Sequence, residues 1–78
     1  MYNYESLTPK QKRILQLSAY GKKDREISRI INIAPTTVRT HKVKIFDKLG
    51  INSMIKALLI YWVNNVEELK NINIEELF

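Results

Sequence analysis

Hydrophobic residues in this chain recur at the three- and four-residue spacing of α-helices, and alternating strand-like runs are weak. The first helical segment opens with Thr8 as a capping residue, Pro9 at the first helical position and Gln11 at the capping-box spacing. Gly21 marks its C-terminal end. The residues predicted to share one side of this helix are Ile14, Leu15, Ser18 and Ala19.

A second helix is predicted over about residues 23–31, where Ile27, Ile30 and Ile31 form a narrow buried stripe. Asn32 suits the left-handed conformation that often ends a helix. Only Ile33 and Ala34 then precede the next helix, and two helices joined this closely must cross at a steep angle. The pattern therefore predicts a helix-turn-helix.

The third helix is predicted over Pro35–Leu49, with proline at its first position and Gly50 as its terminator. Ala34 occupies the cap position and caps poorly, which costs the first turn about 1 kcal/mol relative to serine. On a helical wheel the positions predicted to face the core are Val38, Ile45 and Leu49.

A fourth helix is predicted over residues 53–69, and the short connectors indicate one compact all-α domain of four helices. We place this domain at residues 7–66, between an N-terminal arm at 1–6 and a C-terminal tail at 67–78. A chain of 78 residues buries only a thin core, and the absence of cysteine excludes disulfides and cysteine-bound zinc. A partner subunit would therefore add stability.

Charge is unevenly distributed along the chain. The net charge is +5, and residues 1–50 hold eleven Lys and Arg against four Asp and Glu. Residues 51–78 hold two basic residues against four acidic ones, so the tail is mildly acidic. A basic face attracts polyanions, nucleic acid first among them, although a merely basic surface would give the same composition.

The side of the third helix that faces away from the core has the side chains that a DNA major groove requires. Arg39 can donate two hydrogen bonds to guanine, Thr40 can contact a base edge, and Val43 can contact a thymine methyl. Asp47 on this face must point away from DNA or pair with a cation. A basic amphipathic helix that serves only as solvent-exposed surface is the alternative. The residues expected to contact phosphates are Thr36, Lys44 and Lys48.

The fourth helix has more apolar surface than one side can bury. A two-fold homodimer through its second stripe would cover that stripe and set two recognition helices about 34 Å apart. The alternatives are that the tail from Val66 to Phe78 folds over the stripe, or that a different protein binds it. The first stripe is Met54, Ala57, Leu58 and Tyr61, and the second is Ile55, Leu59, Trp62 and Val66.

The sequence contains no constellation typical of an enzyme, a metal site or a cofactor site. His41, the one histidine, is expected to have a packing or helix-end role, with a phosphate contact as the alternative. The pairs Glu67/Glu68 and Glu75/Glu76 are interpreted as solvated. The longest apolar run, Ala57–Val63, is too short to span a bilayer, and no signal peptide is visible. We expect a non-enzymatic, cytoplasmic protein without a membrane segment or a cofactor.

Several separated motifs resemble the LuxR/GerE type of helix-turn-helix regulator. Leu7-Thr8-Pro9 with Ile14-Leu15 is similar to the family's LTxREREVL opening, and Arg25-Glu26-Ile27-Ser28 after Gly21 is similar to its KEIA segment. The stretch 33–41 resembles ISEKTVKTH, and the stretch 48–51 resembles KLGV. The match covers about residues 7–63 without gaps.

This resemblance implies a four-helix domain whose third helix enters the major groove and whose fourth helix mediates dimerisation. Carried over by position, it gives Arg39, Thr40 and Val43 as base contacts, and it implies phosphate contacts from Lys23, Thr37 and Lys48. It also implies a bacterial or phage-like origin. The chain departs from the family pattern at Gln11, Arg13, Ala34, Val43 and Lys44.

Two of these departures, Val43 and Lys44, fall on the recognition surface, so the target sequence cannot be taken from relatives. We expect a sequence-specific transcriptional regulator that binds double-stranded DNA as a homodimer and associates with the nucleoid when bound. The alternative is a protein-interaction module that captures another regulator through its fourth helix and modulates its DNA binding.

Overall fold

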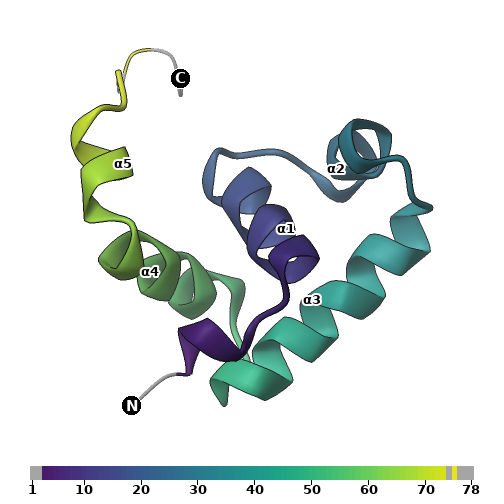
Figure 1. Ribbon diagram of the computed structural model, residues 1–78. Helices are drawn as coiled ribbons and strands as arrows, with labels where there is room; N and C mark the ends of the chain where they lie inside the picture. The colour runs from purple at the N-terminus through teal and green to yellow at the C-terminus, as the bar shows by residue number, and fades with distance from the viewer. Residues whose placement is uncertain (1–2, 74, 76–78) are drawn as a thin grey trace.

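The structure is a computed structural model that describes residues 3–73 and 75. Helices dominate it, and the described residues contain no strand, which confirms the predicted all-α class. Figure 1 shows α3 along one edge of the molecule, α1 at the centre, and α4 and α5 on the far side of α1 from α2. The elements in chain order are η1 (Tyr4–Ser6), α1 (Pro9–Ala19), α2 (Asp24–Ile31), α3 (Pro35–Leu49), α4 (Met54–Asn64) and α5 (Val66–Lys70).

The capping box predicted at the start of α1 is present. The Gln11 backbone N–H donates to Thr8 Oγ1 at 3.1 Å, and the Thr8 N–H donates to Gln11 Oε1 at 3.0 Å. Pro9 occupies the first helical position, where its missing N–H costs nothing. After α1, Gly21 adopts a φ of +85°, which a side chain would strain.

The turn between α2 and α3 is as short as predicted. Asn32 adopts the left-handed conformation with φ +57°, and the Ile33 N–H donates to the Ser28 carbonyl oxygen at 3.0 Å. One expectation for α2 was wrong: Ile30 is 47% exposed, whereas Ile27 is fully buried. Helix α2 packs against α1 and α3 through Ile27, with Ile31 partly buried beside the core, and Ile30 does not take part in it.

Helix α3 spans the predicted residues, Pro35–Leu49. Gly50 ends it with φ +67°, and the Ile51 N–H donates to the Phe46 carbonyl oxygen at 3.0 Å. Ala34 at its N-cap makes no side-chain capping bond, as expected. The three positions predicted to face the core, Val38, Ile45 and Leu49, are all buried.

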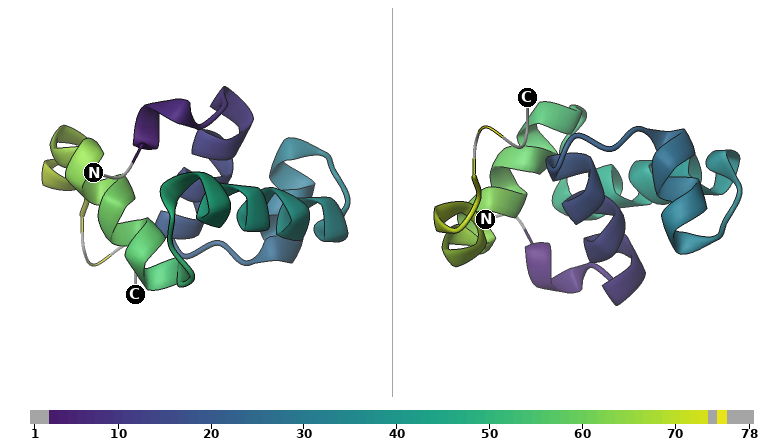
Figure 2. Two further views of the ribbon diagram at one scale, coloured as in Figure 1. Left: turned by 90° about the horizontal axis from the view of Figure 1, so that it is seen from below. Right: turned by 90° about the horizontal axis from the view of Figure 1, so that it is seen from above.

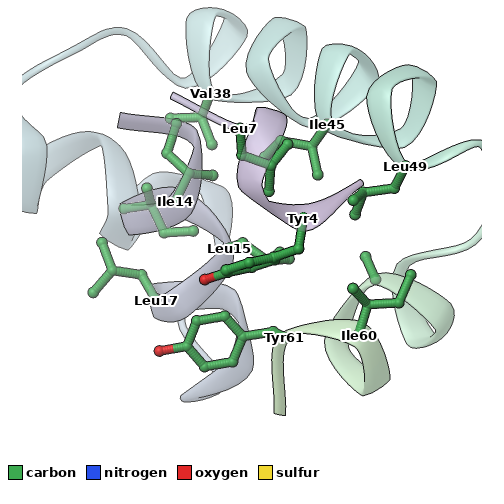
Figure 3. Close-up of a cluster of buried hydrophobic side chains, with 12 residues drawn as sticks. Tyr4, Leu7, Ile14, Leu15, Leu17, Val38, Ile45, Leu49, Ile60 and Tyr61 are labelled. Atoms are coloured by element: carbon green, nitrogen blue, oxygen red, sulfur yellow. The ribbon is translucent and has the colours of Figure 1, made fainter. Parts of the chain in front are cut away.

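One apolar core joins η1, α1, α2, α3 and α4, with Ile27 as the contribution of α2. Figure 3 shows part of this core. Tyr4 belongs to this core, with 7% of its surface exposed and its ring 6.4 Å from that of Tyr61 in an edge-on arrangement. The Tyr4 hydroxyl accepts a hydrogen bond from Asn65 Nδ2 at 3.2 Å. Residues 1–6 were expected to form an arm outside the domain, but Tyr4 is an integral part of the packing.

The prediction of one helix over residues 53–69 was wrong. Helix α4 ends at Asn64, and α5 begins at Val66. The amide groups of Asn64 and Asn65 donate to the carbonyl oxygens of Ile60 and Tyr61, at 2.8 and 2.7 Å. These side chains occupy carbonyl groups of the last turn and help to end the helix there.

Glu68 on α5 is not the solvated residue that was expected. Its carboxylate accepts hydrogen bonds from Gln16 Nε2 at 3.1 Å and from the Tyr61 hydroxyl at 2.8 Å, which ties α5 to α1 and α4. Burial raises the pKa of Glu68, but hydrogen bonds from Tyr20, Gln16 and Tyr61 outweigh it and hold the pKa below its ordinary value. Glu67 is exposed, as predicted.

No helix in the described part of the chain combines the length and the apolar character that a membrane crossing requires.

Candidate nucleic-acid interface

The outer side of α3 is open to solvent. No helix covers it in Figure 1, and α3 is the element nearest the viewer when the molecule is seen from below in Figure 2. The predicted base contacts Arg39, Thr40 and Val43 are all exposed, with Val43 at 65%. The structure thus places these three side chains on one accessible face.

The hydrogen bonding of Thr40 limits what it can offer a base. Its hydroxyl donates to the Thr36 carbonyl oxygen at 3.1 Å, within the helix. The hydroxyl oxygen therefore remains as an acceptor, suited to the amino group of adenine or cytosine. Val43, three residues further on, adds an apolar contact surface beside it.

Arg39 is linked to α2 through Asp24, the first residue of that helix. Asp24 Oδ2 lies 3.7 Å from Arg39 Nε, and Asp24 Oδ1 forms an ion pair with Lys42 Nζ. The Lys42 side chain is only 18% exposed, whereas that of Arg39 is 66% exposed. One carboxylate thus bridges a mostly buried lysine and the exposed arginine.

An open hollow of about 630 Å³ lies where the N-terminal ends of α2 and α3 meet. The phosphate contact Lys23, which the family resemblance implied, lines this hollow. Arg25, which the sequence analysis did not select as a contact, lines it too, although a basic residue in the first turn of α2 was the available signal. Its lining residues are Lys23, Asp24, Arg25, Pro35, Arg39 and Lys42.

The first turn of α3 also carries exposed polar groups. Thr36 and Thr37, both predicted phosphate contacts, are exposed. The N–H groups of Thr37 and Val38 donate to the Ala34 carbonyl oxygen at 3.0 and 3.1 Å. The Thr36 N–H has no hydrogen-bond acceptor among the described residues, so it can bind an anion at the positive end of the helix.

The two predicted lysine contacts differ in their surroundings. Lys44 is exposed, and none of the ion pairs formed among the described residues includes it. The Lys48 ammonium donates to the Ser6 carbonyl oxygen at 3.1 Å and to Gln11 Oε1 at 3.0 Å. Lys48 therefore also holds η1 and the start of α1 against the end of α3.

Asp47 and His41 complete the polar residues of α3. Asp47 is exposed and forms no ion pair among the described residues, so the second of its two expected alternatives, pairing with a cation, is not observed there. His41 Nδ1 is buried without a hydrogen-bond partner in that part of the chain. The pKa of His41 is lowered, mainly because burial disfavours the charged imidazolium and also because the positive charges of Lys10 and Lys44 repel it.

Metal binding finds no support in the described residues, which contain no group of three or more potential ligands positioned to hold an ion.

Helix α4 presents an apolar face away from the core. Of the four predicted dimer contacts, Ile55 and Leu59 are 68% and 61% exposed, and Val66 is 45% exposed. Trp62 is half-buried, with its ring 5.7 Å from that of Tyr20.

Val63, which was not predicted as a dimer contact, is 74% exposed and continues the row. Its four-residue spacing from Leu59 was the available signal. Parts of the predicted covering tail, namely Ile74, Leu77 and Phe78, lie outside the described residues. We refer to Ile55, Leu59 and Val63 of α4, together with Val66 at the start of α5, as the α4 apolar face.

A short turn between two steeply crossed helices, with the second helix open to solvent and bordered by basic residues, defines a helix-turn-helix domain. The family model for bacterial regulatory proteins of the luxR family matches residues 5–61. The chain belongs to this family, as its motifs indicated.

Individual relatives agree with this membership. The chain is 34% identical over 55 residues to the tetrathionate response regulatory protein TtrR of Salmonella typhimurium, covering 70% of this chain and 27% of that protein. It is 38% identical over 52 residues to the uncharacterized response regulatory protein YgeK of Escherichia coli, covering 67% of this chain and 35% of that protein.

A putative HTH-type transcriptional regulator of Mycobacterium bovis, Mb0914c, is 31% identical over 53 residues, which cover 68% of this chain and 6% of that protein. The chain thus spans about a third or less of the length of these relatives. No solved structure matches it significantly.

Proposed function

We propose that this chain binds double-stranded DNA with α3 in the major groove and acts as a sequence-specific transcriptional regulator. The observation that carries the proposal is the uncovered outer face of α3, where Arg39, Thr40 and Val43 are exposed together. Family membership and the regulatory relatives support the same function. Arg39 donates to guanine, Thr40 accepts from an amino group, and Val43 contacts a thymine methyl.

Phosphates lie on both sides of these base contacts. At the N-terminal end, Lys23, Thr36 and Thr37 contact phosphates, together with the Thr36 N–H, which has no acceptor among the described residues. Toward the C-terminal end, Lys44 and Lys48 contact phosphates. These contacts release counterions, so affinity falls steeply with salt concentration.

The test first selects preferred duplexes from a random pool, and then titrates variants against this site and its single-base-pair changes. Arg39→Ala should lose about 1–3 kcal/mol of discrimination at one position of each half-site. Lys44→Ala is the matched control, because it should weaken binding to every duplex equally and reduce the salt slope by about 1. Lys48 suits this control less well, since its truncation also removes two intramolecular hydrogen bonds.

An Arg39→Ala variant that keeps the base preference of the parent would contradict the base-contacting role. A change in preference on Lys44→Ala would contradict the role of Lys44 as a phosphate contact.

The proposal also includes a homodimer through the α4 apolar face. Its α4 residues Ile55, Leu59 and Val63 repeat at four-residue spacing along the helix, which suits packing against a second copy of the same helix. A two-fold axis through this contact would place two copies of α3 about one DNA turn apart, roughly 34 Å.

Light scattering at several protein concentrations tests the dimer. Leu59→Lys should give a monomer, whereas Val43→Lys should remain dimeric, because Val43 is a similarly exposed apolar residue that lies on α3, outside the α4 apolar face. The alternative function, capture of a different regulator through the α4 apolar face, predicts a parent that is monomeric and indifferent to DNA.

A further inference from the structure

We propose that Asp24 is a positioning residue that sets the base specificity of Arg39 from the neighbouring helix. The inference rests on the proposed function of Arg39 and deepens it. It assigns the selectivity of the interface to a residue of α2 that carries a negative charge and contacts no base.

The geometry of Asp24 allows it to act on Arg39 from a fixed position. Asp24 is the first residue of α2, and its Oδ1 pairs with the mostly buried Lys42. That pair holds the carboxylate in place, so its second oxygen, Oδ2, has a defined location 3.7 Å from Arg39 Nε. Lys42 and Arg39 lie three residues apart on α3, and so both can contact one carboxylate.

Because Arg39 faces Asp24 through Nε, the two terminal nitrogens of its guanidinium are the donors that remain available to DNA. The ion pair with Asp24 faces Nε, so both terminal nitrogens of the planar Arg39 guanidinium remain without an ion-pair partner among the described residues. Two parallel donors in one plane are what guanine O6 and N7 require. Without the carboxylate, the exposed Arg39 side chain would lose an orienting contact and would more readily contact a phosphate instead.

The charge of Asp24 opposes general binding to DNA. The carboxylate lies in the same hollow as Lys23 and Arg25, where a phosphate would approach. Removal of this charge should therefore raise affinity for any duplex, while loss of the orienting contact lowers discrimination. A residue that only stabilised the fold would change the affinity for the selected duplex and the affinity for an unrelated duplex in the same direction.

Asp24→Asn tests the inference because it keeps the shape of the side chain and removes the charge. Asp47→Asn is the matched control, since Asp47 is an exposed carboxylate on α3 without an ion pair among the described residues. A thermal unfolding curve is recorded first for each variant, to check that it is folded. Binding is measured on the selected duplex, on its variants changed at the Arg39 position, and on an unrelated duplex.

We expect both variants to bind the unrelated duplex about two- to fivefold more tightly at low salt. Only Asp24→Asn should lose discrimination at the Arg39 position, by about three- to tenfold. Arg39→Ala is measured in parallel to separate the positioning role of Asp24 from the base-contacting role of Arg39.

If Arg39→Ala loses discrimination and Asp24→Asn keeps it, the role of Asp24 is overturned and the proposed function stands. If Arg39→Ala keeps full discrimination, the base-contacting role of Arg39 and the inference built on it are both overturned. Equal losses of discrimination in Asp24→Asn and Asp47→Asn would show a general charge effect and would also overturn the inference.

Discussion

Truncation of Tyr4 to alanine should destabilise the fold strongly, although Tyr4 lies only a few residues from the start of the chain. A tyrosine buries about 150–250 Å², which corresponds to roughly 4–6 kcal/mol as an upper estimate. Aromatic residues truncated in protein cores typically cost about 3–5 kcal/mol. The 7% exposure of Tyr4 and its edge-on contact with Tyr61 place it in that range.

This cost is large for a chain of 78 residues, whose total stability is expected to be about 4–12 kcal/mol. Each kcal/mol shifts the Tm of a domain of this size by about 4–8 °C, so Tyr4→Ala should lower the Tm by at least about 12 °C. Urea unfolding monitored by circular dichroism gives the free energy directly.

Tyr4→Phe is the control for this measurement. It keeps the buried ring and removes only the hydroxyl that accepts from Asn65, so it should cost no more than about 1.5 kcal/mol. A Tyr4→Ala variant within about 0.5 kcal/mol of the parent would refute the packing of η1 into the core and restore the interpretation of residues 1–6 as an arm.

Two further predictions concern α5 and the start of α3. The lowered pKa of Glu68 means that its carboxylate stabilises the fold above about pH 4.5, and that this contribution is lost as the pH falls further. Glu68→Gln should therefore flatten the acid side of the stability–pH curve, whereas the exposed Glu67→Gln should not; curves that coincide with the parent would contradict the contacts of Glu68. Ala34→Ser should supply the missing cap and raise stability by about 1 kcal/mol, seen as a higher urea midpoint, and an unchanged midpoint would count against an uncapped α3.

Local signals in the sequence predicted the helix-turn-helix and the exposed site on α3. Pro35 and Gly50 define the bounds of α3 through their backbone preferences, and Asn32 does the same for the end of α2. The exposure of Arg39 and Val43 follows from their position opposite the buried side of one helix. Each of these features depends on residues that are close together in the chain.

The features that the sequence did not predict depend on contacts between distant residues. Tyr4 is buried because Tyr61, far along the chain, provides an aromatic surface for it. Glu68 is anchored because Gln16 on another helix donates to it. The ion pair between Asp24 and Arg39 joins two helices, and no spacing rule for a single helix predicts it.

Lys48 gives the attachment of η1 a mechanical consequence. Its ammonium joins Ser6 to the last turn of α3, and Tyr4 lies two residues earlier in the core. A pulling force applied at residue 3 would act directly on the packing of Tyr4 and on the hydrogen bond between Lys48 and Ser6, because no flexible linker separates them from residue 3. A segment joined ahead of η1 would therefore be linked to the last turn of α3 through the contacts of Tyr4 and Ser6.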